Sequence, residues 1–136
     1  MALLAGVNLD RRGPPPAGGF GYPVAAGERV FKGGVVAVNA AGSLQRVQTA
    51  GSLVIVGIAH RDLDNTAGAA VSDIKVEALK GIYSLTVPSA TAANINAAVF
   101  ATDDATLTLT QSGSLLAAGT LVGIESGQTY VKMIGG

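Results

Sequence analysis

The sequence predicts an all-β protein: a small β-barrel or sandwich of about 8–10 short strands, with at most one short helix. Two observations carry this prediction. Short runs rich in valine, isoleucine and threonine recur along residues 25–136, and glycine, asparagine or aspartate separates most of them. The chain of 136 residues also contains 19 glycines, which disfavour long helices. A chain of this length is expected to form one domain.

The elements follow from the apolar runs and the turn residues between them. Residues 74–77 alternate apolar and charged side chains, as a half-exposed strand does. Residues 91–96 predict a single helical turn, with Ser89 or Thr91 as its N-cap. The expected strands are residues 35–39, 44–48, 53–60, 74–79, 82–87, 98–102, 106–110, 120–125 and 129–134.

An internal echo relates the two halves of this region. Each half reads as an entry strand, a turn, a return strand, a Val-Gly-Ile strand and a closing strand. Two such units facing each other would close a small barrel or sandwich with few exposed edges. The matched stretches are residues 37–44 with 100–107, Val56-Gly57-Ile58 with Val122-Gly123-Ile124, and residues 74–76 with 130–132.

Residues 1–24 differ in composition from the rest of the chain. The stretch 13–23 is dominated by proline and glycine, which excludes a helix and disfavours a central strand. We therefore predict an extended N-terminal arm over residues 1–24 and a single β domain over residues 25–136. A frayed terminus without a role is the alternative. Apolar anchors suit an arm that is mobile in the free protein and orders on a partner; they are Leu3, Leu4, Val7, Leu9, Phe20 and Tyr22.

Composition narrows the function classes. Nine basic and nine acidic residues give a net charge of zero, without a basic cluster, so nucleic-acid binding is not expected. No apolar run reaches the roughly 18 residues that span a bilayer, and the start of the chain lacks the features of a signal peptide. Only 13% of the residues are charged, which favours a protein whose neutral surface is covered in an assembly. The alternative is a compact β protein with a neutral polar surface.

The sequence contains no catalytic signature, and we expect neither an enzyme nor a cofactor. The chain has one histidine, His60, and no cysteine. A hydrolase would need His60 beside a serine (Ser52, Ser72 or Ser84) and an acid (Asp62 or Asp64), but no motif supports these pairings. A lone histidine at a strand end is more often a surface or packing residue.

Two acidic clusters raise the question of a metal site. Asp62, Asp64 and Asn65 could offer oxygen ligands to calcium, but the spacing is not that of an EF-hand, and turn capping is the favoured interpretation. Asp103 and Asp104 are adjacent, and we expect them to form the turn between two strands. We expect no metal.

Several motifs together resemble the head decoration, or capsid cement, proteins of tailed bacteriophages and prophages. The resemblance covers roughly residues 25–134 and is one of order and spacing. It is carried by Val30-Phe31-Lys32-Gly33-Gly34, Val56-Gly57-Ile58-Ala59, Asp64-Asn65-Thr66-Ala67-Gly68, Lys80-Gly81-Ile82-Tyr83 and Val122-Gly123-Ile124.

This resemblance implies a non-enzymatic structural protein of the virion. Such proteins are made in the host cytoplasm, bind the outer surface of the expanded head and stabilise contacts between subunits of the major capsid protein. It also implies a homo-oligomer, with a trimer favoured and a dimer on two-fold axes as the rival. Two alternatives stay open: a β module of a phage tail or spike, and a β domain that binds a small ligand or sugar.

Overall fold

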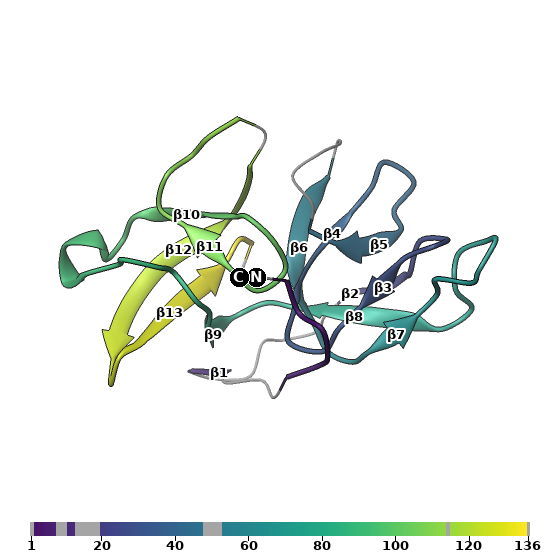
Figure 1. The fold of residues 1–136 in the computed structure, drawn as a ribbon, viewed down its shortest axis with the longest axis horizontal. Coiled ribbons are helices and arrows are strands. Elements are labelled where there is room, and N and C mark those ends of the chain that lie inside the picture. The colour runs from purple at the N-terminus through teal and green to yellow at the C-terminus, as the bar shows by residue number, and fades with distance from the viewer. Residues whose placement is uncertain (1, 8–10, 13–19, 48–52, 114, 136) are drawn as a thin grey trace.

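The computed structural model describes residues 2–7, 11–12, 20–47, 53–113 and 115–135. The protein is nearly all β, as the sequence predicts, and its one helical element in these residues is the 3-10 turn η1 (Ala92–Asn94). Thr91 is the N-cap of η1, in agreement with the predicted helical turn. Figure 1 shows two main β layers side by side, with a small two-stranded sheet at one end.

The two main sheets have different strand counts. The six-stranded sheet has the order β1-β9-β13-β12-β10-β11, and the five-stranded sheet has the order β2-β8-β6-β4-β5. The third sheet pairs β3 (Arg29–Val30) with β7 (Leu63–Asp64). The remaining strands are β1 (Arg11–Arg12), β2 (Phe20–Pro23), β4 (Val35–Val38), β5 (Leu44–Arg46), β6 (Val54–Ala59), β8 (Lys75–Leu79), β9 (Ile82–Ser84), β10 (Ala98–Ala101), β11 (Leu107–Thr108), β12 (Leu116–Glu125) and β13 (Gln128–Met133).

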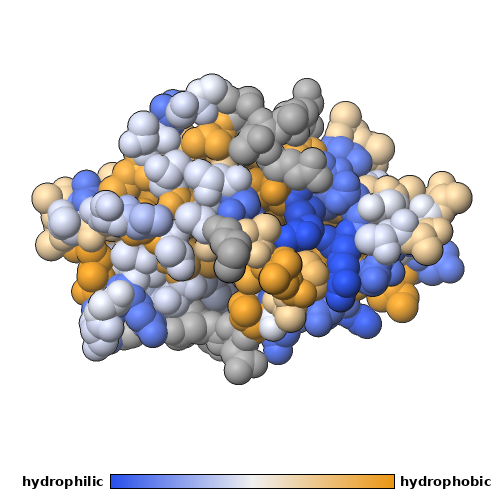
Figure 2. Space-filling view, in the orientation of Figure 1, coloured by the Kyte–Doolittle hydropathy of each residue, from blue (hydrophilic) through white to orange (hydrophobic). Residues whose placement is uncertain are grey.

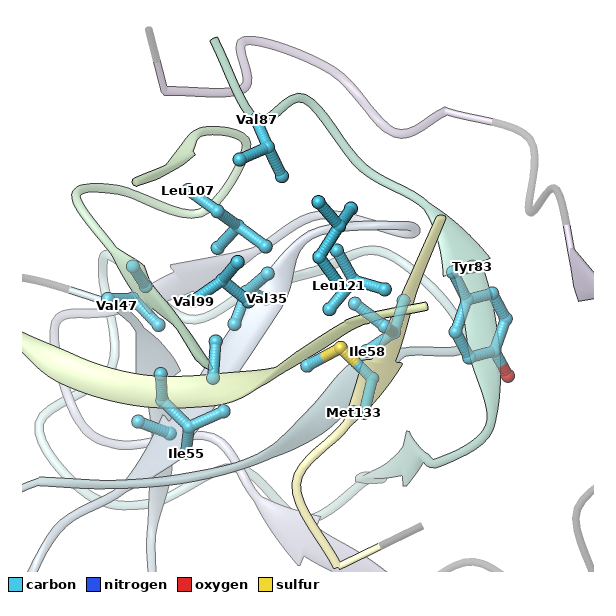
Figure 3. Close-up of a cluster of buried hydrophobic side chains, with 14 of the residues drawn as sticks. Val35, Val47, Ile55, Ile58, Tyr83, Val87, Val99, Leu107, Leu121 and Met133 are labelled. Atoms are coloured by element: carbon cyan, nitrogen blue, oxygen red, sulfur yellow. The ribbon is translucent and has the colours of Figure 1, made fainter. Parts of the chain in front are cut away.

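The sheets of the described residues form no closed barrel. Of the two predicted architectures, the packed arrangement of sheets is therefore the one that forms. Its main core lies between the two large sheets, where valine, isoleucine and leucine side chains interdigitate (Figure 3). The central strands β4 and β6 of the five-stranded sheet are buried on both faces along most of their length, because β3 and β7 cover the other side. This double burial explains why β6 reads as an unbroken apolar run.

The strands differ from the prediction mainly at the N-terminal side. We assigned residues 20–24 to the arm, but the structure builds them into the body. Phe20–Pro23 form β2, which pairs with β8, and Val24 is fully buried. Pro23 fits here because β2 is an edge strand, where a missing N–H is tolerated. Three further short strands, β1, β3 and β7, were also not predicted, and β12 begins at Leu116 instead of residue 120.

The internal echo is a repeat of strand order. In the five-stranded sheet the strands run β2-β8-β6-β4-β5, and in the larger sheet β9-β13-β12-β10-β11 run in the same order beside the added β1. We call residues 20–79 the first repeat and residues 82–133 the second repeat. Each strand of the first repeat therefore has a partner in the second: β2 with β9, β4 with β10, β5 with β11, β6 with β12 and β8 with β13.

Backbone hydrogen bonds repeat along with the strands. Gly33 and Asn96 occupy the same place before the entry strand, and both have a positive φ, at +83° and +77°. Asparagine is among the residues that tolerate this region best after glycine. The matching bonds are Gly33 N to Ala59 O (3.0 Å) and Ala59 N to Gly34 O (3.0 Å), and Asn96 N to Leu121 O (2.7 Å) and Leu121 N to Ala97 O (2.9 Å).

The repeat corrects the alignment that the Val-Gly-Ile triplets suggested. Val36 lies opposite Gly57 and a bulge follows; Val99 lies opposite Gly119, and a bulge follows there too. Gly57 therefore corresponds to Gly119, not to Gly123. At both glycines a Cβ would overlap a backbone carbonyl oxygen of the closing strand, whereas Gly123 has open space. Both Gly57 and Gly119 are therefore needed where the backbone of the closing strand approaches closely.

The repeats pack head to tail. One face of the first repeat, which includes Val35 and Ile58, meets the interior of the second repeat in the main core. The equivalent face of the second repeat carries Ala98 at the position of Val35 and Thr120 at the position of Ile58. These smaller and more polar side chains suit a face that meets solvent instead of a further repeat.

Candidate interaction site at the N-terminal segment

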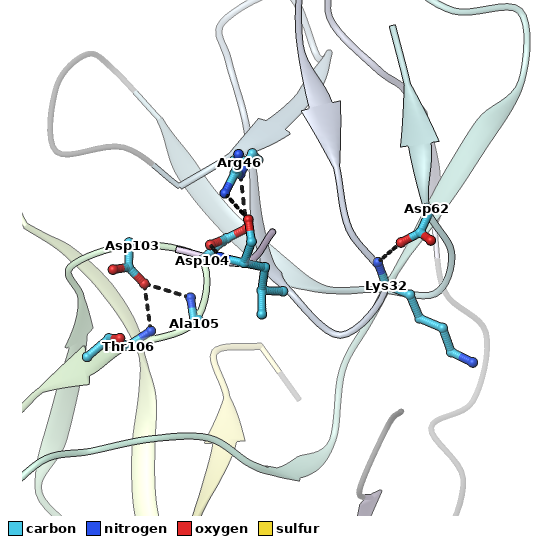
Figure 4. Close-up of polar contacts among 8 residues, drawn as sticks. Lys32, Arg46, Asp62, Asp103, Asp104, Ala105 and Thr106 are labelled. Atoms are coloured by element: carbon cyan, nitrogen blue, oxygen red, sulfur yellow. Dashed lines mark hydrogen bonds and ion pairs between the residues drawn. The ribbon is translucent and has the colours of Figure 1, made fainter. Parts of the chain in front are cut away.

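The N-terminal segment, residues 2–7, is fixed to the body by a buried carboxylate. Asp104 lies in the turn between β10 and β11 and is 1% exposed. Its Oδ1 accepts a hydrogen bond from Leu3 N at 2.8 Å, and its Oδ2 accepts one from Arg46 Nε at 3.0 Å. Arg46 Nη2 in turn donates to Leu3 O at 2.7 Å, which closes the set (Figure 4). We call Leu3, Arg46 and Asp104 the clip.

The clip joins both repeats to the segment. Arg46 ends β5 of the first repeat, and Asp104 belongs to the second. The backbone of Asp104 also accepts a hydrogen bond from Val35 N at 2.9 Å, at the start of β4. The Arg46–Asp104 bond joins two ionised groups, and hydrogen bonds of this kind are stronger than those between neutral groups.

A second attachment holds the other end of the segment. Val7 N donates to Lys32 O at 2.8 Å, and the Val7 side chain lies against Gly33, where a Cβ would overlap it. Gly6 lies equally close to the Asp62 carboxylate, which itself accepts a hydrogen bond from Lys32 N at 2.7 Å (Figure 4). Residues 3 and 7 are thus both anchored, which differs from the mobile arm that the composition suggested.

The anchored segment leaves apolar side chains facing solvent. Leu4 is 84% exposed and Val7 is 45% exposed, whereas Leu3 is half-buried against Gly34. Figure 2 shows hydrophobic side chains near the centre of this view, beside a strongly hydrophilic area. The segment therefore presents a small apolar ridge, formed by Leu4 and Val7, and its backbone is held at both ends.

The other predicted contact residues lie apart from this ridge or outside the described residues. Phe20, at the start of β2, is 73% exposed. Tyr22 is half-buried and packs against the apolar cluster between the five-stranded sheet and the strands β3 and β7. Leu9 lies outside the residues that the structure describes. Of the six predicted residues, Leu3 and Tyr22 contribute to the body, while Leu4, Val7 and Phe20 offer apolar surface.

Charged side chains beside the segment pair with one another. The guanidinium carbons of Arg29 and Arg46 lie 4.6 Å and 5.0 Å from the centroid of the Phe31 ring. Arg29 also lies 3.7 Å from Asp64. Hydrogen bonds from the Thr66 side chain and backbone, and then the charge of Arg29, lower the pKa of Asp64 although burial opposes them. Arg29 and Arg46 are therefore each matched by a carboxylate within the protein.

The candidate catalytic groups have other partners. His60 Nδ1 accepts a hydrogen bond from Glu77 N at 2.8 Å, and Ser72 Oγ donates to Ile74 O at 2.6 Å. Asp64 accepts from the backbone N–H of Thr66, two residues on, as a residue that caps a turn does. Asp62 instead accepts from the backbone N–H of Lys32, thirty residues earlier in the chain. Among the described residues, no hydrogen bond joins His60 to Ser72, Ser84 or either acid; Ser52 lies outside them.

The candidate metal ligands are used in the same way. Asn65 Nδ2 donates to the carbonyl oxygens of Val24, Ala25 and Ala70, and so fastens its loop. No group of three or more potential metal ligands occurs in the described part of the chain. A hollow of about 430 Å³ near β9 and the β12–β13 turn has no ionisable side chain in its lining. Within the same residues, no helix is long and apolar enough to cross a membrane.

Asp103 has a structural role that depends on its charge. Its Oδ1 accepts hydrogen bonds from Ala105 N and Thr106 N, both at 2.8 Å (Figure 4). Burial disfavours the charged carboxylate and these bonds favour it; the net result is a pKa below the ordinary value of 3.8. The stabilisation that follows is complete above the ordinary pKa and is lost as the pH falls through the lower, folded-state value.

This dependence predicts a pH-specific effect of Asp103→Asn. The neutral amide keeps an acceptor oxygen but has no charge to lose. We expect the variant to melt at a lower temperature than the wild type at pH 6, and the gap to shrink as the pH falls below 3.8. Thermal unfolding at several pH values between about 2 and 6 measures it. A gap that stays constant would assign the loss to shape instead of charge.

Comparison with known proteins gives no relative to set beside this geometry, because no family model, curated protein or solved structure matches the chain. The sequence identified the apolar residues of the N-terminal segment but not the clip. Asp104 appeared only as a turn residue, since its partners Leu3 and Arg46 lie far from it along the chain.

Proposed function

We propose that the protein is a structural decoration protein that binds the outside of an expanded phage head and stabilises contacts between major capsid subunits. The observation that carries the proposal is the exposure of large apolar side chains at Leu4 and Phe20, which are 84% and 73% exposed. Apolar side chains of this size are costly to leave in water unless a partner covers them. The sequence resemblance over residues 25–134 supplies the kind of partner.

The anchored backbone supports this role. A ridge that is already held at Leu3 and Val7 loses little conformational entropy when a partner covers it. Several copies binding to one lattice gain further from effective concentration, so that a weak contact per copy suffices. A ligand that binds only the assembled lattice stabilises that lattice by mass action.

The matched charges lead to a further expectation. With a net charge of zero and ion pairs satisfied inside the protein, the contact relies on apolar burial more than on long-range attraction. Salt screens exposed charges over about 8–10 Å but leaves apolar burial intact. Binding to heads is therefore expected to change little between low and moderate salt.

The test is cosedimentation of the purified protein with expanded, undecorated heads and, separately, with unexpanded procapsids of the phage that encodes it. Saturable binding to expanded heads alone is the expected result, and the copy number at saturation gives the symmetry axis. Absence of binding to both particles would remove the proposal.

Leu4→Asp tests the ridge directly. A charge at a position this exposed has little to disturb in the free protein, so the melting temperature is expected to stay within a degree or two. Affinity for expanded heads is expected to fall at least about tenfold, because the carboxylate would have to enter an apolar contact. Deleting residues 1–24 is a poorer test, since it removes β2 and the buried Val24.

Val54→Asp is the matched control for this experiment. Val54 is also a large exposed apolar residue, but it lies on β6 and not in the N-terminal segment. We expect it to bind heads as the wild type does. Equal binding by Leu4→Asp and the wild type, or equal losses in the two variants, would show that the ridge is not the contact.

A further inference from the structure

The outer edge of β2 has no strand beside it among the described residues. β2 ends the five-stranded sheet, and the one strand of the described chain that pairs with it is β8. Gly21 lies opposite Glu77, but the N–H and C=O of Glu77 are both engaged with His60, at 2.8 Å and 3.1 Å. In an antiparallel pair of strands, two residues that lie opposite each other either bond to each other or both turn their N–H and C=O groups away from each other. Because Glu77 bonds to His60 on its other side, Gly21 and Glu77 are of the second kind. The N–H and C=O of Gly21 therefore face outward.

The second repeat shows what occupies this edge. β9 is the counterpart of β2, and β1 pairs with it on its outer side, with Arg11 opposite Tyr83 and Arg12 opposite Ile82. β1 lies outside both repeats, so the edge of the second repeat is completed by an added antiparallel strand. Phe20 in the first repeat corresponds to Tyr83 in the second, because each lies opposite the equivalent position of its closing strand, β8 or β13.

The two counterparts differ in burial. Tyr83 is 2% exposed because it lies in the main core between the two large sheets, whereas Phe20 is 73% exposed. The first repeat has the same strand order, the same edge and an aromatic side chain at the same position, but the described residues place no added strand beside it. Gly21 has no side chain, so a second backbone can approach it closely.

We propose that the edge of β2 receives an extended segment of a protein partner, which pairs antiparallel with β2 through the backbone of Gly21 and covers Phe20. This inference rests on the proposed function, and the partner it assigns is the major capsid protein. A second copy of this chain is a poorer occupant. Its β1 already pairs with its own β9. The four residues of β2 are too short a contact to hold a dimer by themselves, but they can serve as one of several contacts on a lattice.

Gly21→Pro tests the pairing with little effect on the fold. Proline removes the outward N–H and places its ring where the added strand would lie, but it breaks no bond to β8. Gly21→Ala is the matched control: it keeps the N–H, and its Cβ would lie 3.3 Å from Cβ of Lys75, a tight contact that the Cβ of proline shares. Melting temperatures of both variants check that the free protein stays folded.

The assay is cosedimentation with expanded heads, at increasing protein concentration. We expect Gly21→Pro to lose at least about tenfold in affinity and Gly21→Ala to stay within about threefold of the wild type. Wild-type binding with undiminished binding of Gly21→Pro overturns the strand addition and leaves the proposed function standing. If the wild type itself does not bind heads, the proposed function fails first.

A measurement without heads settles the occupant. The oligomeric state of the wild type and of Gly21→Pro, measured by light scattering after size exclusion, is expected to be the same. A wild-type oligomer that dissociates in Gly21→Pro would overturn the assignment to the capsid protein, because the edge would then be filled by a second copy.

Discussion

Gly57→Ala and Gly119→Ala are each expected to destabilise the protein severely, by at least about 3 kcal/mol. At Gly57 a methyl group would overlap the carbonyl oxygen of Leu79, and at Gly119 it would overlap that of Lys132. A backbone oxygen in a central strand cannot turn away as a flexible side chain can. Gly57 also has a φ of +148°, which an L-residue rarely adopts.

Gly123→Ala is the control for this prediction. The sequence triplets Val56-Gly57-Ile58 and Val122-Gly123-Ile124 make Gly123 the apparent counterpart of Gly57. Its Cβ position has nothing within 4 Å, so alanine should cost less than about 0.5 kcal/mol. Chemical denaturation of the three variants measures the differences. A severe loss in Gly123→Ala with a mild one in Gly119→Ala would reinstate the triplet alignment.

The strand positions were predictable because each strand has a local signature. Residues 54–59 form a continuous apolar run, and residues 75–79 alternate, so burial on two faces or on one can be inferred from the sequence. β2 was missed because Phe20-Gly21-Tyr22-Pro23 has poor strand propensity, and its stability comes from pairing with β8 more than fifty residues later. β1, β3 and β7 were missed because two residues carry no periodicity.

The repeat was visible in the sequence, but its register was not. Similar triplets at Gly57 and Gly123 arise by composition in a chain rich in valine and glycine. The true correspondence of Gly57 with Gly119 depends on which backbone approaches which, and on the bulge that both share. The position of Gly33 was matched by Asn96, a different residue that can adopt the same backbone conformation.

The candidate site was predictable in its apolar part only. Phe20 stood out because large apolar residues are unusual in a stretch rich in proline and glycine, and Leu4 because it is an apolar residue of the segment assigned to an extended arm. Asp104 did not, because an aspartate after another aspartate reads as a turn. Only the fold brings it beside Arg46, from the other repeat. Residues whose role depends on a distant partner leave no local pattern.

Asp104→Ala is expected to lower the free energy of unfolding by about 2–4 kcal/mol, near the lower part of the range for a broken buried ion pair, since Arg46 is partly exposed. The change leaves the Arg46 guanidinium without its carboxylate and Leu3 N without its acceptor. For a chain of this size such a loss corresponds to a fall of roughly 10 °C in the melting temperature. Thermal and chemical denaturation measure both quantities.

Asp104→Asn and Asp64→Asn separate the clip from charge in general. Asp64 takes part in an exposed pair with Arg29, so its neutralisation is expected to have little effect. Asp104→Asn keeps an acceptor for Leu3 N but loses the charge beside Arg46, and an intermediate loss is expected. Because the clip joins the N-terminal segment to both repeats, Asp104→Ala should also increase amide hydrogen exchange at Leu3 and at Val35. Faster exchange at Val35 alone would mean that the carboxylate holds the two repeats together and that the segment is kept in place by Val7.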